Sequence, residues 1–479
     1  MVFSSSVFLC AFLPVVLFLY FVIPNLVWRN GLLFVASLIF YAWGEPRNLP
    51  LLLGSILINY LLALGIDALR RSGKGGQKAL LVAAVAVNLA ILFVYKYLNF
   101  AVDNINALLK LLGVASALPR AALSLPIGIS FFTFQAMSYV IDVYRDTVPV
   151  QKNPLRFGLY VALFPQLIAG PIVRYHTVAQ EIGRRSVTID DFSAGARRCI
   201  RGLGKKILLA NTVAVLADYA FDTIAQAPLG FIGAWYGAVC YCLQLYFDFS
   251  GYSDIAIGLG RMFGFHFQEN FNYPYAASTL TDYWRRWHIS LSSWFRDYVY
   301  IPLGGSRVSR GRLLLNLFVV WLLTGIWHGA NWTYICWAMP YFVLLTAEKF
   351  TGLERYLKKN RALALLYRLF TIVTVLACTV IFRSDNIRMA GHYLACMIAP
   401  RSAYAAVGLR YFTKRYVCVV AFAAFLSLPI ARNLWQKAKP HLPKPVAAVT
   451  EDLFFLAVLL VSLANVVSST YNPFIYFNF

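Results

Sequence analysis

The chain has 479 residues, of which 60% are hydrophobic and 13% are charged, with a mean hydropathy of +0.64. This composition excludes an ordinary water-soluble protein and predicts an all-α integral membrane protein with many spans. The formal net charge is +23, but the basic residues stand in short loops between apolar segments. That arrangement favours the positive-inside pattern of cytoplasmic loops over nucleic-acid binding, and it predicts the lipid bilayer as the surroundings.

Uncharged apolar segments recur along the chain and predict about ten to twelve spans. They cover residues 7–23, 31–43, 51–66, 79–95, 157–173, 313–326, 369–382, 417–430 and 453–467. Several are shorter than the roughly 20 residues that cross a bilayer upright, so we expect broken or re-entrant helices. The first segment follows no basic residue and precedes no clear cleavage site, so we expect it to be retained as a helix.

The pattern predicts one integral-membrane domain over residues 1–479. Residues 1–112 alternate apolar runs with turns and suggest scaffold helices, whereas Pro, Gly and paired charges interrupt residues 123–347. Interrupted backbone is tolerated at membrane depth where it is buried in protein or lines a cavity, so the second region is the expected catalytic core. If the basic loops at 70–78 and 197–206 share one side, an even number of crossings separates them. We therefore expect a re-entrant segment near residues 126–130 or 169–171.

Within this region, a polar cluster follows Thr279. Thr279 and Asp282 have capping-box spacing, which predicts the start of a helix. On such a helix Arg285 and His288 share a face, and Asp282 can pair with Arg286. An interfacial amphipathic helix, with its tryptophans and arginines at lipid headgroups, is the open alternative.

Two aspartates, Asp248 and Asp254, interrupt an apolar and aromatic segment upstream of this cluster. Buried carboxylates need partners, and we expect these among Arg285, Arg286 and Arg296. Structural pairing is the favoured role over direct catalysis.

His328 is an ionisable residue within an apolar run, where function is the first hypothesis. Trp327 precedes it, Gly325 and Gly329 are small enough to let a substrate approach, and Asn331 offers amide donors. Desolvation would keep the imidazole neutral, which is the form of a general base. A structural histidine that only hydrogen-bonds its neighbours is the alternative.

Several chemistries have no support in the sequence. The chain lacks a Gly-x-Ser-x-Gly elbow, a His-x-x-x-Asp motif and a P-loop, and residues 258–264 miss the dinucleotide fingerprint by one position. The eight cysteines have neither zinc-ligand nor disulfide-framework spacing. We therefore expect no metal site, no covalent serine mechanism and no nucleotide-driven transport.

Five stretches together make the chain resemble the membrane-bound O-acyltransferase family. They are Leu125-Pro-Ile-Gly-Ile-Ser-Phe-Phe-Thr-Phe-Gln135, Pro165-Gln-Leu-Ile-Ala-Gly-Pro171, Tyr246-Phe-Asp-Phe-Ser-Gly-Tyr-Ser-Asp254, Trp284-Arg-Arg-Trp-His-Ile-Ser-Leu-Ser292 and Trp327-His-Gly-Ala-Asn331. The resemblance implies a multi-span helical bundle around a central tunnel, with His328 as the catalytic residue and His288 as a second polar position. It also implies acyl transfer from a cytoplasmic donor to an extracytoplasmic acceptor. The last hundred residues match none of these motifs.

The resulting hypothesis is an acetyltransferase in the bacterial inner membrane that serves an exopolysaccharide such as alginate, together with a periplasmic acetyltransferase or esterase-like partner. No cofactor is expected to stay bound, and the donor is expected to be acetyl-CoA or another acetyl thioester. His328 would act as general base and His288 would position the substrate. Around them we expect Arg285, Asp254, Asp248 and Trp327, with Asn331 as an oxyanion donor.

Three alternatives remain open on the sequence. The first is transfer of D-alanyl or another acyl group to a cell-wall polymer or lipid. The second is a transporter that makes no bond, and the third is a structural anchor for a secretion complex. The sequence does not identify the donor or the acceptor.

Overall fold

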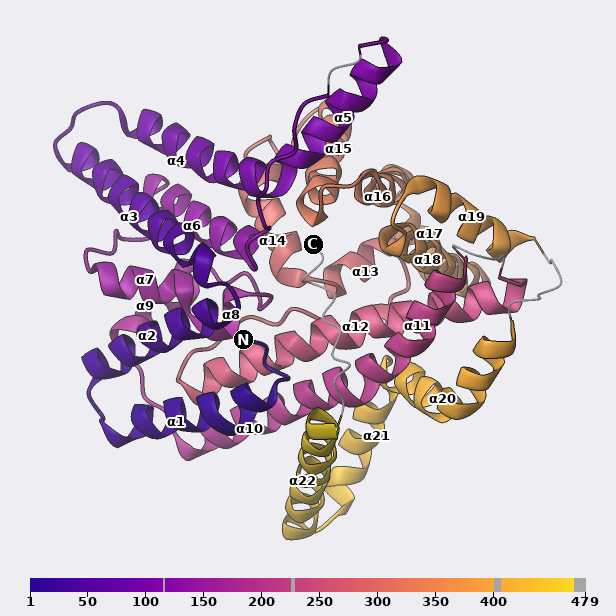
Figure 1. Cartoon of the computed structure of the whole chain (residues 1–479). Helices are drawn as coiled ribbons and strands as arrows, with labels where there is room; N and C mark the ends of the chain where they lie inside the picture. Colours follow the sequence, from indigo (N-terminus) through magenta and orange to yellow (C-terminus); the bar gives the residue numbers. More distant parts are fainter. Residues whose placement is uncertain (115–116, 225–228, 400–405, 469–479) are drawn as a thin grey trace. The chain divides into compact units, whose positions relative to one another are not determined.

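The computed structural model describes residues 1–114, 117–224, 229–399 and 406–468. Within these ranges the regular secondary structure is entirely helical, which confirms the predicted all-α class (Figure 1). Short π-helical or 3₁₀ turns interrupt or join several of the α-helices. The chain therefore has no strand in its described part.

Seven described helical segments are long and apolar enough to cross a membrane, and a pair bent by 70° would add an eighth. The seven are Leu26–Gly44, Pro46–Arg71, Gln77–Leu111, Ile189–Ile224, Arg310–His328, Arg361–Arg383 and Lys444–Ser468, and the bent pair is Thr413–Leu426 with Ile430–His441. This number is below the ten to twelve spans that we expected. The difference arises because some apolar segments, such as Phe8–Val22, form helices that are too short for the length criterion.

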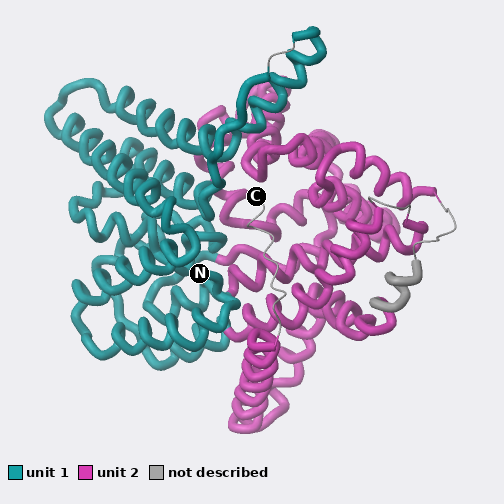
Figure 2. Tube along the Cα trace, in the orientation of Figure 1, with its two compact units in different colours: residues 1–199, 255–268 teal, residues 200–254, 269–479 magenta. Residues whose placement is uncertain are grey.

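The described residues form two compact units (Figure 2). Unit 1 comprises residues 1–199 and 255–268, and unit 2 comprises residues 200–254 and 269–479. The boundary divides α10 (Ile189–Gly204) and α12 (Phe231–Met262) between the units. A single integral-membrane domain therefore stays a prediction.

Unit 1 is built from short and long helices in which α3 packs against α4, α6 and α7, and α2 packs against α7. Its helices are α1 (Leu13–Val22), α2 (Leu26–Gly44), α3 (Leu49–Arg71), α4 (Gln77–Leu92), α5 (Leu98–Leu111), α6 (Ile129–Tyr144), α7 (Pro154–Ala162), α8 (Phe164–Leu167) and α9 (Tyr175–Gly183), with η3 (Phe93–Tyr97) between α4 and α5. The indigo and violet ribbons in Figure 1 follow most of this unit.

The two stretches, one of which we expected to be re-entrant, meet inside unit 1. The apolar segment 157–173 is interrupted, because α7 ends at Ala162 and the four residues of α8 follow. The segment 126–130 begins α6 after Gly128, whose φ is +74°. A Cβ on Gly128 would lie 2.6 Å from the carbonyl oxygen of Leu167, so only glycine fits there. The segment 157–173 is thus interrupted, whereas the expectation that one of the two stretches is re-entrant stays a prediction.

Unit 2 packs α15 against α16, α16 against α18, and α11 against α20. Its helices are η4 (Lys205–Ala210), α11 (Asn211–Ile224), α13 (Leu280–Arg286), α14 (Ile289–Phe295), η6 (Arg296–Tyr300), α15 (Arg310–His328), α16 (Trp332–Thr351), α17 (Leu353–Lys359), α18 (Arg361–Arg383), α19 (Ile387–Ile398), α20 (Ala406–Leu426), α21 (Ile430–Ala438) and α22 (Lys444–Ser468). Buried aromatic residues of α12, α13, α16 and α18 belong to one hydrophobic core. Sequence segments more than a hundred residues apart therefore meet in this core.

Close packing of α10 and η4 along α12 depends on glycines. In unit 2, a Cβ on Gly251 would lie 2.8 Å from the carbonyl oxygen of Gly202. In unit 1, a Cβ on Gly258 would lie 2.6 Å from the carbonyl oxygen of Gly195. Gly258 opens the sequence that nearly matches a dinucleotide fingerprint, and its role here is helix packing near the C-terminal end of α12.

The same helices supply the partners of both buried aspartates. Lys206 Nζ lies 2.7 Å from Asp248 Oδ1, and both side chains are almost completely buried. Asp254 pairs with Lys205 at 2.8 Å and with Arg201 at 3.2 Å. The predicted structural pairing is therefore present, but the predicted partners are wrong.

The arginines that we expected at these aspartates have other surroundings. Arg286 pairs with Asp282 at 2.8 Å, which confirms that predicted pair, and Arg296 pairs with Asp297 at 2.6 Å. Arg285 is exposed on α13. The sequence could not rank the partners, because the lysines became neighbours only through the packing of η4 and α10 against α12.

The contact between α15 and α16 is very close at Gly325. A Cβ there would lie 2.9 Å from the carbonyl oxygen of Tyr334 and 3.0 Å from the Cβ of Ala338. A Cβ on Gly329 would lie 2.2 Å from the ring of Tyr334. These glycines thus admit the neighbouring helix, which corrects our expectation that they leave room for a substrate.

Replacing Lys206 with Met should destabilise the protein strongly, because it leaves the buried Asp248 carboxylate without its cation. Loss of one partner of a buried pair costs about 3–5 kcal/mol. We expect a lower midpoint of thermal unfolding in detergent, and recovery in the double variant Lys206→Met/Asp248→Leu. Lys358→Met removes an exposed pair with Glu354 and should leave the midpoint unchanged. Equal midpoints for the two single variants would contradict the structural role of the buried pair.

Replacing Gly325 with Ala should force α15 and α16 apart. Overpacking of this kind costs about 1–3 kcal/mol, and we expect a lower thermal midpoint in detergent. Gly311→Ala is the matched control, since Gly311 is in the same helix and no atom lies within 4 Å of its Cβ position. A Gly325→Ala midpoint at or above that of the control would refute the close contact.

Candidate active site

His328 is the last residue of α15, and the chain changes direction directly after it. Gly329 has extended backbone with φ 174°, and Asn331 caps α16 by accepting a hydrogen bond from the backbone N–H of Thr333 at 3.1 Å. Only 5% of His328 is exposed. The histidine is therefore held at a helix end inside unit 2, where neighbouring helices surround its ring.

Aromatic rings form most of these surroundings. The His328 ring centroid lies 4.8 Å from that of Trp337, 4.9 Å from that of Trp327 and 5.3 Å from that of Phe382, each in an edge-to-face arrangement. Aromatic side chains from α15, α16 and α18 therefore surround the ring of His328.

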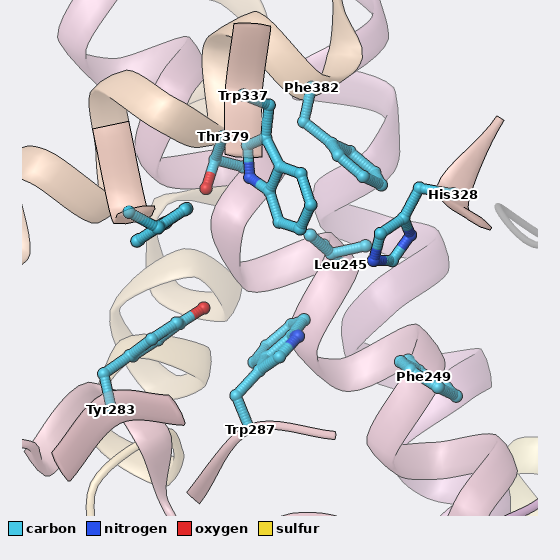
Figure 3. A pocket seen from close by; sticks show the side chains of 9 residues that line it. Leu245, Phe249, Tyr283, Trp287, His328, Trp337, Thr379 and Phe382 are labelled. Carbon is cyan, nitrogen blue, oxygen red and sulfur yellow. The ribbon is translucent and has the colours of Figure 1, made fainter. Parts of the chain in front are cut away.

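A small cavity lies beside the ring of His328 (Figure 3). Its volume is about 20 Å³, counted as the space that the centre of a water molecule can reach. Helices α12, α13, α15, α16 and α18 contribute to its wall. The lining residues are Leu245, Phe249, Tyr283, Trp287, His328, Trp337, Tyr341, Thr379 and Phe382. Eight of the nine are buried, so this is an enclosed and predominantly aromatic space.

Most of these lining residues were missed by the sequence analysis. Trp337 and Tyr341 are four apart on α16, and Thr379 and Phe382 are three apart on α18, which places each pair on one helix face. The same spacing is common in any core helix, so it carried no functional signal. Residues 379 and 382 also lie beyond the expected catalytic core of 123–347, although the limits of that core are otherwise untested.

His288 occupies a break between α13 and α14. Its backbone is left-handed, with φ 44° and ψ 55°, and only 1% of the residue is exposed. Burial lowers the pKa of His288 to about 3, so its imidazole is neutral at physiological pH. Because α13 ends at Arg286, the predicted shared helix face of Arg285 and His288 is wrong.

Trp327 and Phe249 link this second histidine to the cavity wall. The ring centroid of His288 lies 4.7 Å from that of Phe249, which lines the cavity, and 5.9 Å from that of Trp327. Trp327 also contacts His328, so one indole lies against both histidines. A role for Trp327 in binding substrate stays a prediction.

The start of α13 follows the predicted capping pattern and adds a partner from another helix. Thr279 accepts a hydrogen bond from the backbone N–H of Asp282 at 3.1 Å. The carboxylate of Glu348 on α16 accepts the backbone N–H groups of Leu280 at 2.8 Å and Thr281 at 2.9 Å. A carboxylate at a helix N-terminus is stabilised by the unpaired N–H groups and by the helix dipole. The sequence contained no signal that pointed to Glu348.

The aromatic residues of α13 are part of the core. Tyr283 and Trp287 are buried and line the cavity. They therefore do not have the lipid-facing exposure that an interfacial amphipathic helix would give them. The exposed Arg285 lies on the same helix but no described contact joins it to His288.

The side chain of Asn331 makes hydrogen bonds that hold the protein backbone. Besides capping α16, its amide Nδ2 donates to the carbonyl oxygen of Asp385 at 2.8 Å. Asp248 and Asp254 are held in their ion pairs with η4 and α10. These contacts do not support an oxyanion role for Asn331. A catalytic role for Asn331, Asp248 or Asp254 stays a prediction. Among the described residues no group of three His, Cys, Asp or Glu side chains could hold a metal ion.

Comparison with known proteins places this site in a family. The profile of the membrane-bound O-acyltransferase family matches residues 122–380. Over the full length of both proteins the chain is 40% identical to a protein named probable alginate O-acetylase AlgI from Pseudomonas putida. It is 45% identical to a protein of the same name from Pseudomonas syringae, over 83% of this chain and 75% of the relative. It is also 36% identical to a peptidoglycan O-acetyltransferase from Helicobacter pylori, over 73% of this chain and 70% of the relative.

The matched region contains both histidines and most of the cavity wall, and seven described helices are long and apolar enough to span a membrane. The chain belongs to the membrane-bound O-acyltransferase family and is a multi-pass membrane O-acyltransferase.

Proposed function

We propose that this protein transfers an acetyl group from a cytoplasmic thioester donor, such as acetyl-CoA, across the bacterial inner membrane for O-acetylation of an exopolysaccharide such as alginate. A periplasmic acetyltransferase or esterase-like partner would complete the transfer to the polymer. The full-length similarity to alginate O-acetylases supports the polymer. The observation that carries the chemistry is the buried, aromatic-walled cavity against His328.

In this mechanism the neutral imidazole of His328 removes the proton from an acceptor hydroxyl. The hydroxyl oxygen then forms a bond to the acetyl carbonyl carbon, the carbon–sulfur bond breaks, and the thiol leaves with a proton returned by the imidazolium. The aromatic wall supports this role, since it keeps water away from the thioester and limits hydrolysis.

His288 would position the substrate by a hydrogen bond. It lies beside Phe249 of the cavity wall and against Trp327, the neighbour of His328 in the chain. A rigidly held polar group of this kind contributes through orientation of the substrate.

The cavity volume favours a short acyl group. A space of about 20 Å³ on this measure is of the order needed for a single water molecule. An acetyl methyl is comparable in size, whereas a longer acyl chain would require displacement of buried side chains.

Peptidoglycan is a second candidate acceptor, because one relative is named for its acetylation. The relative from Helicobacter pylori is named a peptidoglycan O-acetyltransferase, and the chemistry at the hydroxyl would be the same. The two acceptors are separated by measuring acetyl esters in both polymers from one host that makes alginate and lacks its own O-acetylase gene. Acetyl esters that appear only on peptidoglycan would overturn the alginate proposal.

Replacing His328 with Ala should lower acetyl transfer by about 100-fold or more, since a general base contributes roughly 10²–10⁴ in rate. The measurement is the acetyl ester content of alginate from the complemented host, normalised to the amount of protein in the membrane. His392→Ala is the matched control, because His392 is an exposed histidine of α19. Full transfer by the His328 variant would exclude base catalysis and favour a conduit that makes no bond.

Replacing Leu245 with Ala should enlarge the cavity and relax the selection for a short acyl group. We expect the ratio of butyryl to acetyl transfer, measured in membranes supplied with labelled acyl-CoA, to rise by about tenfold, which corresponds to the 1–3 kcal/mol discrimination of one or two methylenes. Leu243→Ala is the matched control on the same helix, since Leu243 is buried but does not line the cavity. An equal change of the ratio in both variants would contradict this assignment of the acyl pocket.

A further inference from the structure

The side chain of Asn270 is completely buried beside His288. Its Oδ1 lies 3.1 Å from His288 Nδ1, 3.2 Å from the backbone nitrogen of Ser290 and 2.9 Å from Ser290 Oγ. Its Nδ2 lies 3.0 Å from Ser253 Oγ. Four polar groups from two separate segments of unit 2 therefore converge on one amide.

These contacts fix the orientation of the amide. The backbone N–H of Ser290 can only donate, so the amide atom that faces it must be the oxygen. With the amide reversed, its NH₂ group would point at this N–H and two donors would oppose each other. The observed orientation also lets Nδ2 donate to the hydroxyl of Ser253. The backbone N–H of Ser290 thus decides which atom of the Asn270 amide is the oxygen and which is the nitrogen.

The orientation of the amide then decides the tautomer of His288. An amide oxygen only accepts, so Nδ1 of His288, which faces Oδ1 at 3.1 Å, must carry a hydrogen. A neutral imidazole has one N–H, and its second nitrogen, Nε2, therefore holds the lone pair. Nε2 is buried and has no hydrogen-bond partner among the described residues.

The backbone of Asn270 holds the same turn. Its carbonyl oxygen accepts the N–H of Ile289 at 3.0 Å, directly after the left-handed residue His288. A left-handed conformation is unfavourable for a residue with a Cβ and persists only where the surroundings impose it. Asn270 thus restrains both the backbone of His288 and the state of its ring.

We infer that Asn270 is a positioning residue that locks His288 in the Nδ1–H tautomer and so leaves Nε2 free to accept a hydrogen bond from the substrate. This inference rests on the proposed function for the identity of the group that Nε2 meets, whereas the tautomer itself is a property of the resting protein. Asn270 does not touch the reacting atoms and acts through His288.

The direct test is nitrogen NMR of ¹⁵N-histidine-labelled full-length protein in lipid nanodiscs, with the His288 signals assigned by their loss in His288→Gln. We expect a protonated Nδ1 and an unprotonated Nε2 in the unmodified protein. Asn270→Leu removes the acceptor at nearly constant volume and should give a mixture of tautomers. A protonated Nε2 in the unmodified protein would overturn the inference.

Measurements of acetyl transfer then distinguish a role of Asn270 in fixing the tautomer of His288 from a role in packing alone. Asn270→Leu should lower acetyl transfer by about 10- to 100-fold, as for other residues that orient a functional histidine. Asn270→Asp keeps an acceptor for Nδ1–H and should retain most transfer at neutral pH. Its carboxylate raises the pKa of His288, so transfer should be lost at acidic pH where the unmodified protein stays active. Equal losses in the Leu and Asp variants, with unchanged tautomer, would show a purely structural role.

The control is Asn316→Leu. Asn316 is equally buried in unit 2, where its Nδ2 donates to the carbonyl oxygens of Leu303 and Gly305. Its loss should lower the thermal midpoint without changing the tautomer of His288.

Full transfer by His328→Ala would refute the proposed function and would not affect the tautomer result. A protonated Nε2 with normal acetyl transfer would refute only the inference about Asn270.

Discussion

The contact of α15 with α16 at Gly325 and Gly329 is the packing constraint on which the site depends. It leaves no space for a side chain on either glycine, so α16 lies directly alongside the end of α15 at His328. The same helix α16 then brings Trp337 into the cavity wall and Glu348 to the N-terminus of α13. One helix pair thus positions the first histidine, part of its aromatic surroundings and the helix that leads to the second histidine.

The buried ion pairs and the lining of the cavity are separate within unit 2. The buried aspartates pair with lysine and arginine side chains of α10 and η4. The cavity wall, in contrast, has no Asp, Glu, Lys or Arg among its nine lining residues. The ion pairs of the motif aspartates therefore hold α12 to α10 and η4, whereas uncharged side chains line the cavity beside His328.

The fold class and some local contacts could be predicted. The hydropathy of the chain predicted a helical membrane protein, and the capping pattern at Thr279 and the pair of Asp282 with Arg286 are present in the structure. The partners of Asp248 and Asp254 were predicted wrongly, because the sequence cannot show which helix packs against α12. The length of the helix after Thr279 was also overestimated, since the left-handed break at His288 is imposed by tertiary contacts with Asn270.

The sequence by itself determined the membrane class, the family and the two histidines, because these follow from composition and from local motifs. Only the tertiary structure decided that Gly325 and Gly329 admit a helix, that α18 helps to enclose the cavity, and that Asn270 fixes the orientation of one imidazole. The physical reason is that each of these depends on atoms brought together from distant parts of the chain. Hydrogen-bond direction and close packing are properties of those contacts, and no local pattern of residues specifies them.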